Sequence, residues 1–455
     1  MTFPPYSDYM GTEVHRFPGQ KDRGRGLWVN ATAVSGLTAL VKGAGALKTV
    51  AIARFFGTGD DLDAYVLAFL IPSFIGDVLC GAIVPALVPR FVELLHQEKQ
   101  AAMLELYTGA FWLSITFVGR LAVALVVVAA LLIVAQIGRR ATLVCSLLLI
   151  MVPILPLSAM SNMWRATLNA NRRFAVAAGA SALTPIVMIL SMIAAGPRVY
   201  WLAVGTTVGA LAETIALGLG LRSLGMPRLS REASQWKLRS YIATREYGSL
   251  AITNLVLGSS LFLDQSMAAM LGFGAVSVLN YGTRLVAALL AVGPEALGIT
   301  LLPRFSRMVA EGGHRQMRPV LKKYLCIAMF GSTIMTGALV CASELIVKLV
   351  LKHGAFSASD ALAVASVQRL SLLQLPFAVG VALLSRFIAS AKLNRTLIPI
   401  SVVSLFLNAG LNLLLMQRFS VAGIALSTTF AQAAMFILLL VAVSRILRSQ
   451  EALTC

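Results

Sequence analysis

Residues 121–137 read LAVALVVVAALLIVAQI, a run in which apolar side chains follow one another without a charged residue and without regular alternation. A transmembrane β-strand needs about 10 residues with alternating polarity, whereas a membrane-spanning helix needs about 20 consecutive apolar residues. The run belongs to a longer apolar segment that begins near residue 103. This stretch therefore predicts a helix that crosses a lipid bilayer, and it argues against an outer-membrane barrel.

The whole chain has the composition of a protein that crosses the membrane many times. Of its 455 residues, 58% are hydrophobic and 13% are charged, whereas a soluble domain has about 25% charged residues. We therefore expect an all-α polytopic membrane protein with about twelve spans. The expected spans are 27–55, 62–92, 103–137, 141–166, 174–195, 199–221, 244–270, 275–303, 321–350, 362–390, 396–417 and 421–444.

The distribution of basic residues predicts the orientation of the chain. The formal net charge is +19, from 38 Lys and Arg against 19 Asp and Glu. Twelve spans place both termini on one side, whose segments hold 26 Lys and Arg against seven on the other side. Because basic loops are retained in the cytoplasm, we expect a multi-pass protein with both termini cytoplasmic. This explanation of the basic excess requires no nucleic-acid partner.

The second half of the sequence repeats motifs of the first half. The matching pairs are FGTG (56–59) with GFG (272–274), LVPRF (87–91) with LLPRF (301–305), and AVGTT (203–207) with ALSTT (425–429). Six spans in each half make the two halves enter the membrane in the same direction, as in transporters with parallel repeats. We expect two six-helix lobes, related by a pseudo-two-fold axis, around a central cavity. The expected parts are a cytoplasmic N-terminal tail (1–26), an N-lobe (27–221), a basic connector (222–243), a C-lobe (244–444) and a cytoplasmic C-terminal tail (445–455).

A few charged residues fall deep inside the expected spans. A charge at mid-membrane costs at least about 2.5 to 3.5 kcal/mol, so it needs a partner, water or a ligand. Lys42, Lys48 and Arg284 are candidates to bind an anionic substrate in the cavity, with Asp77 as a neighbouring acid. Two alternatives stay open: Asp77 and Glu295 neutralise these cations in structural pairs, or Lys48 extends to the membrane surface.

Uncharged polar residues gather in the C-terminal half around one carboxylate. Asn408 and Asn412 are four residues apart and share a helix face, while Asp264 and Thr428 lie in two other spans. Their oxygen atoms are the hard ligands that a small cation such as Na⁺ prefers. The alternative is that these side chains hydrogen-bond neighbouring helices together.

No enzyme signature is present in the sequence. The chain contains neither a P-loop nor an HEXXH motif, and no histidine lies in an expected span. Cysteines form no CxxC pair, so no metal or disulfide framework is expected. We expect a transporter without a cofactor, driven by a gradient, the membrane potential or the substrate itself.

Three stretches carry a resemblance to a known family. They are AIARFFGTGDDLDAYVLAFLIPSF (51–74), VPALVPRF (84–91) and NYGTRLVAALLAVGPEALGITLLPRFSRM (280–308). The chain resembles, over essentially its whole length, the MurJ (MviN) family of lipid II flippases in the multidrug/oligosaccharidyl-lipid/polysaccharide exporter superfamily. The resemblance implies alternating access around a cationic cavity that accepts a polyprenyl-diphosphate glycan.

Family positions in the cavity can be compared residue by residue. The resemblance implies that Lys42 and Lys48 stand where the family has essential arginines, and that Arg284 retains a third. A further family arginine falls at Gly76, directly before Asp77. The charge of the first two positions is kept, but the bidentate geometry of arginine is lost.

The resemblance also implies a sodium site, and it shows where this chain departs from the family. The site maps onto Asp264, Asn408, Asn412 and Thr428, with Asn412 where an aspartate is expected. A family glutamate falls at Gly81. The family has fourteen spans against the twelve counted here, and these departures leave a related lipid-linked sugar open as the substrate.

With the resemblance, we expect a multi-pass flippase of the bacterial inner membrane. It would move a polyprenyl-diphosphate-linked glycan precursor, lipid II or a related lipid-linked sugar, from the cytoplasmic to the outer leaflet. Its partners would be this substrate, the bilayer and enzymes of envelope glycan synthesis. The alternatives are a cation-coupled multidrug exporter of the same superfamily and a transport-inactive membrane scaffold.

Overall fold

The computed structural model describes residues 23–97, 99–136, 138–223, 245–291, 314–390, 393 and 396–453, and this part of the chain is helical and contains no strand. The N-lobe helices are α1 (Arg23–Phe56), α2 (Asp60–Ile75), the π-helix η1 (Gly76–Cys80), α3 (Ile83–His96), α4 (Gln100–Val134), α5 (Arg139–Met151), α6 (Ile154–Ala170), α7 (Phe174–Gly179), η2 (Ala180–Ala182), α8 (Leu183–Ala195) and α9 (Val199–Arg222). The C-lobe helices are α11 (Arg245–Ala268), η3 (Ala269–Leu271), α12 (Ala275–Leu290), α14 (His314–Leu351), α15 (Ala358–Leu372), α16 (Leu375–Ser390) and α17 (Leu397–Leu453).

The expectation of about twelve spans is confirmed. Within the described ranges, nine stretches are long and apolar enough to cross a membrane. The last of them holds two helices, because Ser420 has φ of 52° and ψ of −135° and breaks α17. Helices α11 and α12 supply the two remaining crossings.

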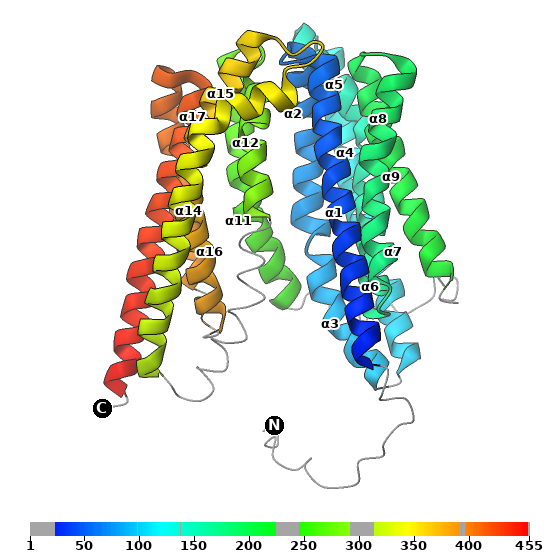
Figure 1. The fold of residues 1–455 in the computed structure, drawn as a ribbon. Helices are drawn as coiled ribbons and strands as arrows, with labels where there is room; N and C mark the ends of the chain where they lie inside the picture. The colour runs from blue at the N-terminus through cyan, green and yellow to red at the C-terminus, as the bar shows by residue number, and fades with distance from the viewer. Residues whose placement is uncertain are drawn as a thin grey trace.

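The two halves of the chain form two lobes that converge at the end of the bundle away from the start of α1 and the end of α17 (Figure 1). Helices α1 to α9 make one lobe and α11 to α17 the other. The repeated FGTG and GFG motifs join α1 to α2 and η3 to α12, so they occupy equivalent junctions. The LLPRF motif and most of the connector, residues 224–243, lie outside the described residues.

Each lobe has fully buried core residues, and the largest buried cluster continues from the N-lobe to C-lobe residues such as Phe356. In the N-lobe, Phe91, Leu147 and Met163 are fully buried in one cluster. In the C-lobe, Leu384 and Phe387 of α16 pack against Leu439 of α17 without exposure. Side chains interdigitate tightly in such cores, so each lobe resists internal deformation.

The convergent end is held by contacts between the lobes. The Ala355 backbone N–H donates to the Arg54 carbonyl at 2.8 Å, and Thr58 Oγ1 donates to Asp360 Oδ1 at 2.5 Å. Gly57 has φ of +59°, and a side chain at this position would meet the Ala355 carbonyl. We call residues 54–63, 272–277 and 354–360 the closed end.

The expected domain limits differ from the helix ends by a few residues. Helix α1 begins at Arg23, inside the expected tail 1–26, and α17 continues to Leu453, inside the expected tail 445–455. Helices extend past apolar runs because helical hydrogen bonding does not require apolar side chains, so hydropathy marks the membrane-embedded part and not the helix end.

Candidate functional site

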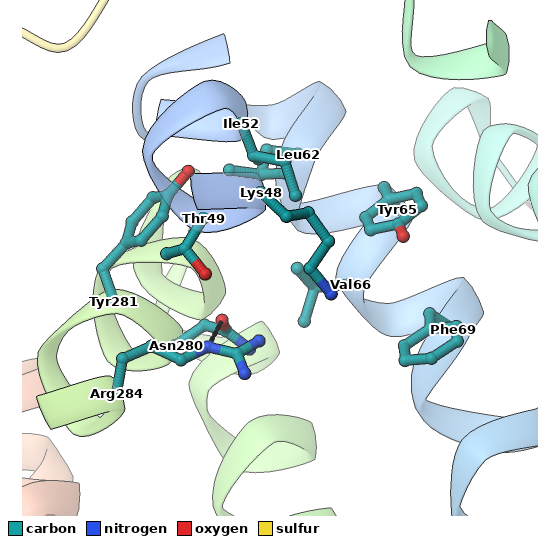
Figure 2. A pocket seen from close by; sticks show the side chains of 10 residues that line it. All are labelled: Lys48, Thr49, Ile52, Leu62, Tyr65, Val66, Phe69, Asn280, Tyr281 and Arg284. Carbon is teal, nitrogen blue, oxygen red and sulfur yellow. Dashed lines mark hydrogen bonds between the residues drawn. The ribbon is translucent and has the colours of Figure 1, made fainter. Parts of the chain in front are cut away.

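A pocket of about 510 Å³ of empty space, partly continuous with solvent, lies between the lobes beside the closed end. It is shown in Figure 2. Its lining comes from α1 and α2 of the N-lobe and from α12 of the C-lobe: Lys48, Thr49, Ile52, Leu62, Tyr65, Val66, Phe69, Asn280, Tyr281 and Arg284. The pocket therefore belongs to neither lobe alone, and any relative movement of the lobes changes it.

One wall of the pocket is the apolar face of α2. Leu62, Tyr65, Val66 and Phe69 follow the i, i+3, i+4, i+7 spacing, which places them on one side of a helix. The Tyr65 hydroxyl is turned away to Thr206, 2.9 Å from its Oγ1. The wall therefore offers aromatic and aliphatic surface and no negative charge.

Lys48 and Arg284 reach into the pocket from opposite lobes (Figure 2). Arg284 Nε donates to Asn280 Oδ1 at 3.1 Å, which orients the guanidinium. Among the residues that the structure describes, no carboxylate lies within ion-pair distance of Lys48 or Arg284. Two unpaired cations in a partly apolar pocket attract an anion strongly, because the surrounding dielectric is low.

Lys42 makes a second contact between α1 and α12, apart from the pocket. Its Nζ donates to the Ala291 carbonyl, where α12 ends, at 3.4 Å. Lys42 and Lys48 are six residues apart, a rise of roughly 9 Å, and Ala291 and Arg284 are seven apart, roughly 10 Å along α12. Lys42 therefore bridges the lobes about 9 Å closer to the termini than the Lys48 and Arg284 pocket, and it does not line that pocket.

Asp77 lies apart from the predicted cations. It is exposed on η1, and it makes no ion pair among the described side chains. Its backbone carbonyl accepts a hydrogen bond from Asn254 Nδ2 of α11 at 3.2 Å. A second hydrogen bond between the same helices runs from Tyr247 Oη to the Leu79 carbonyl at 2.9 Å. Asp77 thus lies where η1 contacts α11 between the lobes, and the suggested pairing of Asp77 with a lysine is not observed among the described side chains. The suggested partner of Arg284, Glu295, lies outside the described residues.

The four polar residues selected in the C-lobe do meet. Asp264 Oδ1 accepts from Asn408 Nδ2 at 2.8 Å and from Asn412 Nδ2 at 2.7 Å. Thr428 Oγ1 lies 3.1 Å from Asp264 Oδ2. We call these four residues with Ser260 and Ser427, which contact the two asparagines, the C-lobe cluster. It ties α11 to both halves of α17.

The C-lobe cluster has oxygen types that suit a small cation, and amide N–H groups occupy two of the positions that face Asp264. The atoms that face Asp264 Oδ1 are amide nitrogens, which donate hydrogen bonds and repel a cation. No group of three or more His, Cys, Asp or Glu suited to a metal occurs in the described ranges. Sodium binding at these residues stays a prediction.

Several pocket residues carry no charge and were not selected from the sequence. Asn280 lies one helical turn before Arg284, and this i, i+4 spacing is the signal that would have indicated their contact. Tyr281 packs edge-on against Phe356 of the closed end, with ring centroids 5.7 Å apart. Aromatic residues are common in apolar runs, so sequence alone does not separate a pocket tyrosine from a lipid-facing one.

Comparisons with known proteins give one consistent family. The family model described as lipid II flippase MurJ matches residues 52–455. A curated relative of that name from Burkholderia cenocepacia is 27% identical over 304 residues, which cover 63% of this chain and 58% of the relative. In that match the chain spans less than two thirds of the relative's length. A probable lipid II flippase MurJ from Helicobacter pylori is 26% identical, with 85% of this chain and 88% of the relative covered.

Solved structures show the same fold. A lipid II flippase MurJ in an inward closed conformation matches with a TM-score of 0.76 at 20% identity, over 91% of this chain and 87% of that one. An inward-facing multidrug resistance MATE transporter of the MOP superfamily matches with a TM-score of 0.74 at 12% identity, over 92% and 96% of the two chains. With the family model matching most of the chain, this protein belongs to the MurJ family of lipid II flippases.

Proposed function

We propose that this protein is a flippase for a polyprenyl-diphosphate-linked glycan precursor, lipid II or a close relative of it. The observation that carries the proposal is the placement of Lys48 and Arg284, which line one inter-lobe pocket from opposite lobes. Relatives named lipid II flippase support lipid II as the substrate. Translocation runs from the cytoplasmic to the outer leaflet and serves peptidoglycan or envelope polysaccharide synthesis.

The pocket suits the diphosphate of such a lipid. Lysine binds phosphate as a point charge, while the arginine fork donates two parallel hydrogen bonds. A headgroup held by Lys48 of one lobe and Arg284 of the other links the lobes, so its binding and release are coupled to their relative position. Lys42, about 9 Å closer to the termini, is a contact for an entering headgroup once its bond to the Ala291 carbonyl is exchanged.

The orientation follows from the charge distribution. The side with more Lys and Arg holds both termini and is placed in the cytoplasm. The closed end, opposite the termini in Figure 1, then faces the outer side of the inner membrane. In this orientation the conformation is closed toward the outer side of the membrane.

Depletion of the protein in its native cell tests the proposed function. We expect an isoprenoid-linked sugar to accumulate in the inner leaflet, because its synthesis continues while its exit stops. Mass spectrometry of the lipid extract identifies the sugar, and re-expression of the wild-type chain should remove it. Unchanged lipid-linked sugars together with lost drug resistance would instead favour a multidrug exporter, and changes only in enzyme recruitment would favour a scaffold.

Lys48→Ala is expected to lower translocation about tenfold, because one charge-assisted hydrogen bond to phosphate contributes about 1.5 to 3 kcal/mol. Lys48→Arg should retain translocation, since it keeps the charge. Lys348→Ala is the matched control: this lysine pairs with Glu344 at 2.6 Å on α14 and does not line the pocket. Equal rates in the two alanine variants, at equal membrane abundance, would remove Lys48 from the site.

A further inference from the structure

The carboxylate at the centre of the C-lobe cluster is satisfied by neutral donors. Asp264 is buried, and it accepts two amide N–H groups at Oδ1 and one hydroxyl at Oδ2, all within 3.1 Å. No Lys or Arg pairs with Asp264 in the part of the chain that the structure describes. Hydrogen bonds of this kind favour the charged form of a carboxylate and partly offset the cost of burying it without a counter-ion.

The direction of the Asn412 amide is fixed by its other end. Asn412 is fully buried, and its Oδ1 accepts from the hydroxyl of Ser427, which is also fully buried. Turning the amide over would place Oδ1 against Asp264 Oδ1, an acceptor against an acceptor. The Nδ2 group is therefore held 2.7 Å from the carboxylate.

The oxygens that a cation would need are mostly engaged. Asn412 Oδ1 is bound by Ser427, and the Thr428 hydroxyl lies within reach of both Asp264 and the Ile424 carbonyl. Asn408 Oδ1 is buried without a partner, and it alone among the amide oxygens of the cluster is available. Hydroxyl oxygens of Ser260 and Thr428 keep free lone pairs, but a cation would have to displace two amide N–H donors to reach Asp264 Oδ1.

We infer that the Asn412 amide, held by Ser427, takes the place of a cation at Asp264, so that this C-lobe is assembled without bound sodium. This inference does not rest on the proposed substrate. The cluster joins α11 to both halves of α17 through hydrogen bonds alone. This cluster then gives translocation no coupling to a sodium gradient.

Restoring a second carboxylate should create the sodium site that the amide replaces. In Asn412→Asp, two acidic groups face each other at the distance now bridged by Nδ2, and a cation relieves their repulsion. We expect sodium affinity at least about tenfold above that of the wild type, since two charges about 4 Å apart interact by several kcal/mol even at an effective dielectric constant of 20. The measurement is ²²Na⁺ binding to purified protein, with the thermal midpoint in NaCl compared with KCl.

The exchange variant Asp264→Asn with Asn412→Asp is the matched control. It keeps one carboxylate and one amide facing each other, so it should bind sodium no better than the wild type. Wild-type protein that binds ²²Na⁺ as tightly as Asn412→Asp overturns the inference, and so does an exchange variant that binds as tightly. If Asn412→Asp does not fold, saturable binding of ²²Na⁺ to the wild type that Asp264→Asn abolishes decides against the inference. None of these outcomes changes the lipid accumulation that tests the proposed function.

Discussion

Arg284→Ala is expected to reduce headgroup translocation by about two orders of magnitude. A guanidinium that binds phosphate through two charge-assisted hydrogen bonds contributes about 1.5 to 3 kcal/mol for each, and a loss of 1.4 kcal/mol is a factor of ten. Arg284 is the C-lobe cation of the pocket, and Asn280 already orients it. The effect should therefore exceed that of Lys48→Ala, which removes a single flexible contact.

The measurement is the rate at which the lipid-linked sugar reaches the outer leaflet in cells that carry only the variant. Arg284→Lys should recover part of this rate, because it keeps the charge and loses the fork. Arg369→Ala is the matched control, since Arg369 pairs with Glu344 at 2.9 Å and lies outside the pocket. A normal rate in Arg284→Ala at normal abundance would show that the pocket does not hold the diphosphate.

Asp63→Leu is expected to open the closed end. Asp63 is fully buried on α2, and its Oδ1 accepts from the Ser277 backbone N–H of the other lobe at 2.7 Å. Its Oδ2 lies 3.3 Å from Arg140 Nη2, and Arg140 also pairs with Asp60. Leucine leaves the Ser277 N–H and part of the Arg140 guanidinium unpaired.

The pair with Arg140 lies within the N-lobe and is lost in either conformation, whereas the Ser277 N–H bond to the carboxylate joins the lobes and contributes about 1.5 to 3 kcal/mol. The population of the conformation closed at this end, relative to one open there, should therefore fall about tenfold to a hundredfold. The reaction of a membrane-impermeant thiol reagent, added from outside, with Thr49→Cys in a cysteine-free background measures the opening. Thr49 lines the pocket directly behind the closed end.

Asp61→Leu serves as the control for this experiment. Asp61 lies in the same helical turn as Asp63 but is exposed. It should leave thiol labelling at position 49 unchanged. Equal labelling in Asp63→Leu and Asp61→Leu would show that the Asp63 to Ser277 contact does not hold the lobes together.

The sequence by itself determined the number of spans, the division into two like halves and the family. Apolar runs are readable because every span must bury its backbone in hydrocarbon. Under the same constraint, polar residues inside a span are rare and therefore easy to recognise. Three spans supply the selected set of Asp264, Asn408, Asn412 and Thr428. These side chains meet in one cluster. Lys48 and Arg284 were selected in the same way, and they share one pocket.

Only the tertiary structure decided how these groups are used. It separated Lys42 and Asp77 from the pocket, added Asn280 and joined Asp63 to Ser277. It also turned the Asn412 amide toward Asp264, where residue type alone suggested a sodium ligand. The physical reason is that many of these helices are apolar on all sides, so their sequence does not specify their rotation about their own axes. Rotation and spacing are set by packing against neighbouring helices, and they determine which polar atoms come within hydrogen-bonding distance.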